Sequence, residues 1–285
     1  MFNLVFNVVV CIFVGRSLYF LGRCHAPIVC RAGGLIDSHI HLDDRRFDAD
    51  RSQLLVEARQ TGITGFVVPA TMVSGFAKIK ALAHEHDDVF PAYGLHPYFV
   101  HQHQPNDLQI LADFLQNNQA VALGECGLDF YRDDLDRNKQ QVFFEQQLEM
   151  AKDMDLPLIL HVNGAVQAVF ELLKKHQYFN AVMHSFNGSA EQARQITETG
   201  VILGFGTAVV NPNARKLHQV IKSVALEHMV IETDAPDQPL YNNKNGRNLP
   251  VCLWQVAEFI AEQKDIAVTQ LIQACDDNCR RVFAL

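Results

Sequence analysis

The sequence lacks an excess of basic residues, and this absence limits the partners it can have. Its 285 residues include 24 Lys and Arg against 32 Asp and Glu, which gives a formal charge of −8 at pH 7. Non-specific binding to duplex DNA depends on Lys and Arg side chains that displace counterions from the backbone. The composition therefore excludes an extended duplex-binding surface, and a phosphate substrate would need a local source of positive charge.

The sequence also lacks a disulfide framework, a linker, an internal repeat and a low-complexity stretch. Its seven cysteines are odd in number and form no close set of pairs, unlike the cysteines of small secreted domains. Cys275 and Cys279 stand one helical turn apart, and we interpret them as reduced packing thiols. Reduced thiols indicate a cytoplasmic location.

Residues 1–34 contain no Asp or Glu, and Arg16, Arg23 and Arg31 are their only Lys or Arg residues. The remaining 251 residues carry a formal charge of −11. Residues 2–21 are mostly apolar with Arg16 as their only charge, and no positive charge precedes the apolar centre 8–14 as it would in a signal peptide. The length of the run is marginal for a membrane span. Three interpretations stay open: a non-native or non-essential extension with a start at Leu35, an anchor, or a signal. We prefer the first, so no membrane partner is expected.

From Leu35 onward, short apolar runs alternate with longer amphipathic stretches such as 136–154 and 192–199, whose apolar residues recur at helical spacing. Nearly all-apolar strands, each followed by a helix, indicate parallel pairing through crossovers. Eight such units in 35–285 predict one domain, an α/β TIM (β/α)8 barrel, with a doubly wound sheet as the alternative. The eight predicted strands are 35–36, 65–69, 92–95, 120–123, 158–160, 181–183, 201–203 and 229–231.

Side chains that bind metals follow five of these predicted strands. They are His39 and His41, Glu125, His161, His184 and Asp234. Barrel active sites lie at the carboxyl ends of the strands, so these side chains are expected to meet at one mouth. His39 and His41 are two residues apart and project to the same side of an extended chain. We interpret the other histidines as ordinary core or surface residues. His96 is the exception, because it lies at the end of the third predicted strand.

Six ligands are too many for a single catalytic metal, which usually takes three protein ligands and keeps a position open. Two divalent cations that share a bridging carboxylate would use all six. Such a pair stabilises the attacking and leaving oxygens of a displacement, and it would supply the positive charge that the acidic chain lacks. Mixed imidazole and carboxylate ligands are compatible with Zn, Mn or Mg.

Several blocks of the sequence resemble the TatD-related metal-dependent hydrolases, amidohydrolase-like barrels whose better-studied members are deoxyribonucleases. The resemblance covers essentially all of 35–285, and the block that begins at Glu232 is most similar to the YjjV branch of that family. The blocks are 36–42 (IDSHIHL), 94–97 (GLHP), 124–129 (GECGLD), 184–189 (HSFNGS) and 232–237 (ETDAPD).

The resemblance implies a role for each candidate residue. His39, His41 and Asp234 would hold one cation, His161 and His184 the second, and Glu125 would bridge the two. Asp234 would also orient the attacking water or take its proton. His96 is expected to touch the substrate phosphate or the leaving group. Asp129 is expected to shape its loop or to support a ligand, with Gly127 marking a tight turn.

The chain departs from the family pattern after His161. Relatives usually continue with Ser and then Arg, whereas this chain has Val162 and Asn163. Loss of an Arg that could clamp phosphate weakens the assignment of the substrate. Arg132, Lys244 and Arg247 are the basic residues that could replace it, or they are solvated loop charges.

Three functions are compatible with these observations. The leading hypothesis is a metal-dependent phosphodiester hydrolase, a deoxyribonuclease of exonuclease type that acts on DNA ends or short nucleotides. The second keeps both metals but cleaves an amide, a lactone or an aminoacyl ester. Dinuclear amidohydrolases of that kind commonly bridge their metals with a carboxylated Lys, and Glu125 stands at that place here, which favours the first hypothesis. The third is a non-catalytic binding protein, which the complete ligand set disfavours.

Overall fold

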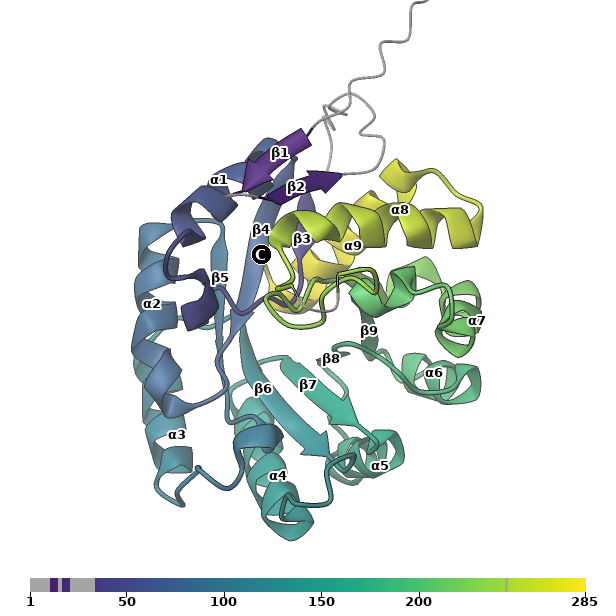
Figure 1. Ribbon diagram of the computed structural model, residues 1–285. Helices are drawn as coiled ribbons and strands as arrows, with labels where there is room; N and C mark the ends of the chain where they lie inside the picture. Colours follow the sequence, from purple (N-terminus) through teal and green to yellow (C-terminus); the bar gives the residue numbers. More distant parts are fainter. Residues whose placement is uncertain (1–10, 15–16, 21–33, 244–245) are drawn as a thin grey trace, which may run out of the picture.

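The computed structural model describes residues 11–14, 17–20, 34–243 and 246–285. Its centre is a parallel sheet of eight strands in the order β10-β9-β8-β7-β6-β5-β4-β3, enclosed by helices (Figure 1). This arrangement confirms the predicted TIM barrel. The strands are β3 (Leu35–Asp37), β4 (Ile63–Pro69), β5 (Val89–Tyr93), β6 (Ala122–Asp129), β7 (Leu158–Asn163), β8 (Ala181–Met183), β9 (Ile202–Phe205) and β10 (Met229–Ile231).

Helices connect the strands on the outside of the barrel. Two of them match the amphipathic stretches found in the sequence: α4 covers the first, and α6 begins two residues early, where Ser189 and Gln192 form a capping box. The helices are α1 (Arg51–Gln60), α2 (Phe76–Glu85), α3 (Asp107–Asn117), α4 (Arg137–Asp153), α5 (Val166–His176), α6 (Ala190–Thr197), α7 (Arg215–Ser223), α8 (Leu253–Lys264) and α9 (Val268–Phe283).

The barrel closes where the first strand of the sheet meets the last. The amide and the hydroxyl of Ser38 both donate to the Ile231 carbonyl, at 3.1 and 3.0 Å. Beyond the strands, the Asp234 amide donates to the His39 carbonyl at 2.9 Å, and the His41 amide donates to the Ala235 carbonyl at 2.8 Å. The seam therefore ties His39, His41 and Asp234 to one another through the backbone.

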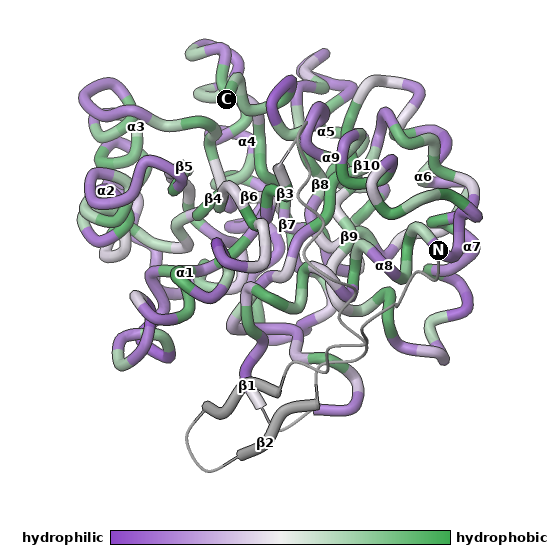
Figure 2. The backbone as a smooth tube through the Cα atoms, turned by 90° about the horizontal axis from the view of Figure 1, so that it is seen from above, coloured by the Kyte–Doolittle hydropathy of each residue, from purple (hydrophilic) through white to green (hydrophobic). Residues whose placement is uncertain are grey.

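The interior of the barrel is a packed apolar layer to which every strand contributes one residue. The hydropathy of the chain agrees with this: hydrophobic residues run along the central strands, and hydrophilic residues gather on outer turns (Figure 2). Cys279 and Phe283 of α9 join the same cluster, so the last helix packs against the barrel interior. The eight strand residues of the layer are Ile36, Val67, Ala92, Ala122, Ile159, Val182, Ile202 and Val230.

The sequence placed the ends of two strands too early. Glu125 and His161 lie within β6 and β7 rather than after them, because the two strands stay paired as far as Asp129 and Asn163. Gly127, expected at a tight turn, lies within β6 with φ +128°. A Cβ atom at this position would lie 2.2 Å from the His161 carbonyl oxygen. Glycine is thus required by the close approach of β7.

Part of the N-terminal segment forms a two-stranded antiparallel sheet of β1 (Cys11–Val14) and β2 (Ser17–Phe20). The rest of residues 1–33 lies outside the described ranges, so the origin of the segment stays a prediction. Among the helices of the described residues, none has both the length and the apolar character of a membrane span. Cys275 and Cys279 are buried free thiols in the core, as predicted.

Phe283→Ala is expected to destabilise the protein by about 3–5 kcal/mol, because it empties a buried site where α9 packs against the barrel. Urea unfolding followed by circular dichroism measures the change. Val142→Ala on the exposed face of α4 is the control, with an expected change within about 0.5 kcal/mol. Equal stability of the two variants would show that α9 does not support the core.

Candidate metal centre

All six predicted ligands meet at one end of the barrel, together with His96. Each comes from the carboxyl-terminal part of a strand or from the residues directly after it, and parallel strands bring these ends to the same mouth. His39 and His41 follow β3, His96 follows β5, Glu125 lies in β6, His161 in β7, His184 follows β8 and Asp234 follows β10.

Glu125 occupies the centre of the cluster because β6 is irregular at this residue. Its neighbours Gly124 and Cys126 pair with consecutive residues of β7, so Glu125 is left out of the ladder. Its amide donates instead to the Ala70 carbonyl at 3.0 Å. A bulge of this kind re-aims one side chain, and here the carboxylate is 1% exposed.

One oxygen of Glu125 faces the ligands at the seam. Oε2 lies 3.2 Å from His39 Nε2 and 3.5 Å from His41 Nε2. Asp234 Oδ1 lies 3.7 and 3.4 Å from the same two nitrogens. A tetrahedral ion with bonds of about 2.1 Å holds its ligand atoms about 3.4 Å apart, so each of these contacts has the spacing of two ligands of one cation, and His39, His41 and Glu125 form one group at ligand spacing.

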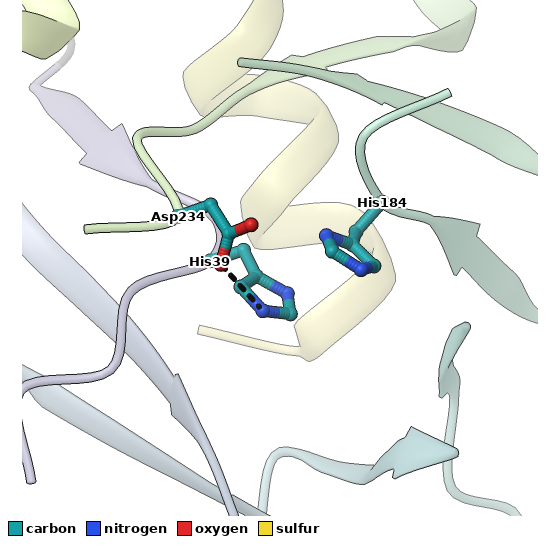
Figure 3. A group of neighbouring side chains, drawn as sticks. All are labelled: His39, His184 and Asp234. Atoms are coloured by element: carbon teal, nitrogen blue, oxygen red, sulfur yellow. Dashed lines mark ion pairs between the residues drawn. The ribbon is translucent and has the colours of Figure 1, made fainter. Parts of the chain in front are cut away.

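The other oxygen of Glu125 faces three different imidazoles. Oε1 lies 2.8 Å from His96 Nε2, 3.1 Å from His161 Nδ1 and 2.9 Å from His184 Nε2. The His184 ring stacks on the His39 ring, with centroids 4.0 Å apart, so the two sets of ligands are adjacent (Figure 3). The carboxylate thus stands between two groups of nitrogen atoms.

The electrostatics of the cluster favour ionised carboxylates. Burial alone would raise the pKa of Glu125, but the surrounding imidazoles, led by His96 and His184, hold it well below its usual range. Burial likewise opposes the charged form of His41, yet the hydrogen bond with Asp234 and the charge of Glu125 raise its pKa to about 10. Both directions show that the cluster favours positive charge beside Glu125 and Asp234.

A second observation, a buried carboxylate oxygen without a hydrogen bond, supports a divalent metal at this site. Glu125 Oε2 is fully buried and accepts no hydrogen bond from any described residue. An unpaired buried carboxylate oxygen is costly, and two imidazole nitrogens and a second carboxylate oxygen lie around it at ligand spacing. An ion at this position would satisfy all of these atoms.

Two histidines have a carboxylate beside their other ring nitrogen. His161 Nε2 lies 3.1 Å from Asp129 Oδ2, which leaves Nδ1 turned toward Glu125. His184 Nδ1 lies 3.5 Å from the buried Glu232 carboxylate, a charge contact without a hydrogen bond, and its Nε2 is turned inward. Such outer contacts fix the tautomer of metal-binding histidines.

His96 turns a protonated ring nitrogen toward the cluster instead of a lone pair. Its Nδ1 accepts the Tyr98 amide at 3.0 Å, so in the neutral ring Nε2 carries the proton. Burial lowers the pKa of His96 to about 4, and the ring is therefore neutral at pH 7. In this form His96 presents a hydrogen-bond donor to the cluster and no free lone pair.

Sequence reasoning assigned no role to three residues that position the ligands. Asp37 is fully buried and accepts from the Thr233 amide and hydroxyl at 2.9 and 2.6 Å, which locks the end of β3 to the end of β10. Gln238 Nε2 donates to Asp234 Oδ2 at 2.6 Å. Asp37 comes two residues before His39, and Glu232 comes two residues before Asp234. Residues two apart project to the same face of a strand, and this spacing is the sequence signal that could have identified Asp37 and Glu232.

The cluster opens into a cleft of about 460 Å³. Its lining contains five carboxylates but a single guanidinium, that of Arg46. Arg46 forms ion pairs with both Asp44 and Asp237, at 2.9 and 2.7 Å. The cleft is thus acidic, and its one arginine is already neutralised.

The basic residues considered as replacements for the missing arginine are engaged elsewhere. Arg132 pairs with Asp134 and donates to the Tyr98 hydroxyl. Arg247 pairs with Asp50 and with the Arg46 carbonyl. Lys244 lies outside the described residues. Asn163 itself donates to Asp129 Oδ2 at 3.3 Å, so it supports the partner of His161.

A parallel barrel that gathers imidazoles and carboxylates around a buried glutamate has the fold and the site of a metal-dependent hydrolase. The chain belongs to the TatD-related DNase family, whose family model matches residues 36–284.

Known relatives agree with this membership. The chain is 34% identical to the uncharacterized metal-dependent hydrolase YjjV of Escherichia coli K12, over 90% of this chain and 99% of the relative. It is 29% identical to a protein of Edwardsiella piscicida named 3′-5′ ssDNA/RNA exonuclease TatD, over 88% of this chain and all of that protein. The crystal structure of E. coli YjjV superimposes with a TM-score of 0.85 at 33% identity, over 88% of this chain and 98% of that one.

Asp129→Asn is expected to weaken metal binding by about 10–100-fold, because the variant loses the carboxylate that orients His161. Calorimetric titration of metal-free protein with Mn²⁺ measures the affinity. Glu145→Gln is the matched control: Glu145, Glu149 and His176 also bring ligand-type atoms together on the surface, but Glu145 already pairs with Lys175. Unchanged affinity in Asp129→Asn would contradict the role of this carboxylate.

Proposed function

We propose that the protein hydrolyses phosphodiester bonds with two divalent cations, Zn, Mn or Mg, and acts as a deoxyribonuclease on DNA ends or short nucleotides. His39, His41 and Asp234 would hold one cation, and His161 and His184 the other. The observation that carries the proposal is the position of Glu125, whose two oxygens face separate sets of imidazole nitrogens. A bridging ligand between two cations has this arrangement.

Cations bound there would lower the pKa of a water molecule and stabilise negative charge on the phosphoryl oxygens. Asp234 is the residue suited to orient that water and to accept its proton. Burial would raise its pKa, but its hydrogen bond with His41 and the neighbouring histidines lower it, so the carboxylate is ionised. Gln238 holds Oδ2 while Oδ1 points to His39 and His41.

His96 would act as a hydrogen-bond donor to the substrate. Its Nε2 faces Glu125 Oε1 at 2.8 Å at the edge of the cleft, and its tautomer is fixed by the Tyr98 amide. Once a cation binds Glu125, a donor at this place could turn to a phosphoryl oxygen or to the oxygen of the leaving group. His96, Glu125 and His161 also lie at the spacing of metal ligands, so the metal content of a His96 variant separates the two roles.

Two further facts support a phosphodiester substrate. The E. piscicida relative is named an exonuclease for single-stranded DNA and RNA, and a Danio rerio relative, 29% identical, is named a putative deoxyribonuclease. The cleft itself is acidic, so an anionic substrate can enter only with cations in place. A cytoplasmic location stays a prediction from the reduced cysteines.

The second candidate is hydrolysis of an amide, a lactone or an aminoacyl ester on the same site. Asn163 favours it, because a neutral amide beside Asp129 offers no bidentate clamp for phosphate. The two candidates share their metal ligands and differ in the bond that is cleaved.

Glu125→Ala is expected to lower hydrolysis of labelled single-stranded DNA and of a p-nitrophenyl phosphodiester by at least about 100-fold, more than the loss of an outer partner of a ligand. Metal-reconstituted wild-type protein and the variant are assayed on both substrates and on an acyl ester. Activity on the acyl ester alone, abolished in Glu125→Ala, would replace the phosphodiesterase proposal with the second candidate.

His96→Ala is expected to reduce kcat on the phosphodiester by about 10²–10³, the loss typical of one donor to developing negative charge. Metal content, measured by elemental analysis, is expected to stay at the wild-type value because His96 is not a ligand. Loss of an equivalent of metal from His96→Ala would contradict this role and make His96 a ligand.

A further inference from the structure

Three exposed tyrosines lie on loops at the catalytic end of the barrel. Tyr98 follows β5, Tyr131 follows β6 and Tyr241 follows β10, with exposed fractions of 39%, 78% and 43%. The other strongly exposed large hydrophobic side chains of the described residues are two valines, on α1 and α4. Aromatic rings left in water beside a polar cleft are typical of a surface that binds a flat ligand.

Tyr98 is the one of these three that lines the cleft. It lies in the short 3-10 helix Pro97–Phe99, and its amide is the donor that fixes the His96 tautomer. Its ring centroid is 6.5 Å from that of His96 and 5.1 Å from that of Phe99. A planar group on Tyr98 would therefore sit directly beside the reacting end of the cleft.

Arg132 holds the Tyr98 ring in place. Its Nη1 donates to the phenol oxygen at 2.8 Å, and its Cζ lies 4.9 Å from the ring centroid. Nε and Nη2 of the same guanidinium are bound to Asp134 at 2.8 and 2.5 Å. Because its charge is paired, Arg132 is poorly suited to clamp a phosphate and well suited to fix an aromatic side chain.

We propose that Tyr98, positioned by Arg132, stacks on the base of the nucleotide whose phosphodiester bond is cleaved. This inference rests on the proposed function and adds a residue that would position the nucleotide. Stacking accepts every base because each has a π-face, so no base-specific contact is needed. A base inside a duplex is already stacked and paired, so the contact requires an unpaired base, in keeping with the single-stranded nucleic acid in the name of the E. piscicida relative.

The test compares two single-stranded oligonucleotides that differ in the terminal nucleotide removed by the enzyme. One carries an ordinary base there, and the other carries an abasic tetrahydrofuran residue. Tyr98→Ala is expected to lower kcat/KM on the ordinary substrate by about tenfold, as for one lost base–aromatic contact, and to leave the abasic substrate at the wild-type rate. Tyr98→Phe keeps the ring and is expected to keep most of the activity.

Tyr241→Ala is the matched control, because Tyr241 is equally exposed on the same end of the barrel but outside the residues that line the cleft. Its activity on both oligonucleotides is expected to equal that of wild type. An equal loss on both substrates in Tyr98→Ala would overturn base stacking and leave the phosphodiesterase proposal intact. Wild-type protein that cleaves neither oligonucleotide, with metals bound, would overturn both proposals.

Discussion

A buried carboxylate must be surrounded by positive charge or by hydrogen-bond donors, and the catalytic end of this barrel is organised around that requirement at Glu125. Moving an isolated ion out of water is costly, yet Glu125 is 1% exposed and five imidazoles lie around its two oxygens. Metal binding displaces protons from imidazoles and leaves carboxylates ionised. The pKa values of His41 and His184 are raised and that of Glu125 is lowered. A cation that bound these atoms would therefore have to displace protons from the two imidazoles.

The same requirement bears on the proposed anionic substrate, because the cleft around Glu125 is itself acidic. Asp43, Asp44 and Asp237 line the cleft together with Glu125 and Asp234. The one guanidinium of the cleft, that of Arg46, forms ion pairs with Asp44 and Asp237. Arg46 thereby links the loop after β3 to the loop after β10, across the seam that carries His39, His41 and Asp234. Arg46 thus stabilises the loops that carry the candidate ligands and is not available to bind an anion. Under the proposed function, attraction for a phosphate would come from the cations, and affinity for substrate would depend on the metal content rather than on the surface charge of the chain.

The sequence predicted the barrel and brought the six candidate ligands to one mouth because both depend on local signals. Apolar runs mark the strands, and residues such as His39, His184 and Asp234 follow strand ends directly. It placed Glu125 and His161 beyond their strands because the apolar runs end at Leu123 and Leu160. Gly127 was expected at a turn, whereas it is needed where the His161 carbonyl approaches. The roles of Asp37, Glu232 and Gln238 were missed because they depend on contacts between segments 47 to 196 residues apart, or on a loop whose path no periodicity encodes.

Strands and loops have separate tasks in this site. The candidate ligands lie in strands or directly after them. Hydrogen bonds between neighbouring strands and across the junction of β3 and β10 fix the backbone at these residues. The groups that would select a substrate, Tyr98 and Arg132, lie on the loops after β5 and β6 and touch each other across them. Asn163 lies between these two parts, because it ends β7 and supports Asp129, at a position where the family resemblance led us to expect arginine. In our two proposals the cations would neutralise the phosphate and Tyr98 would contact the base, so neither proposal requires a charged side chain at position 163.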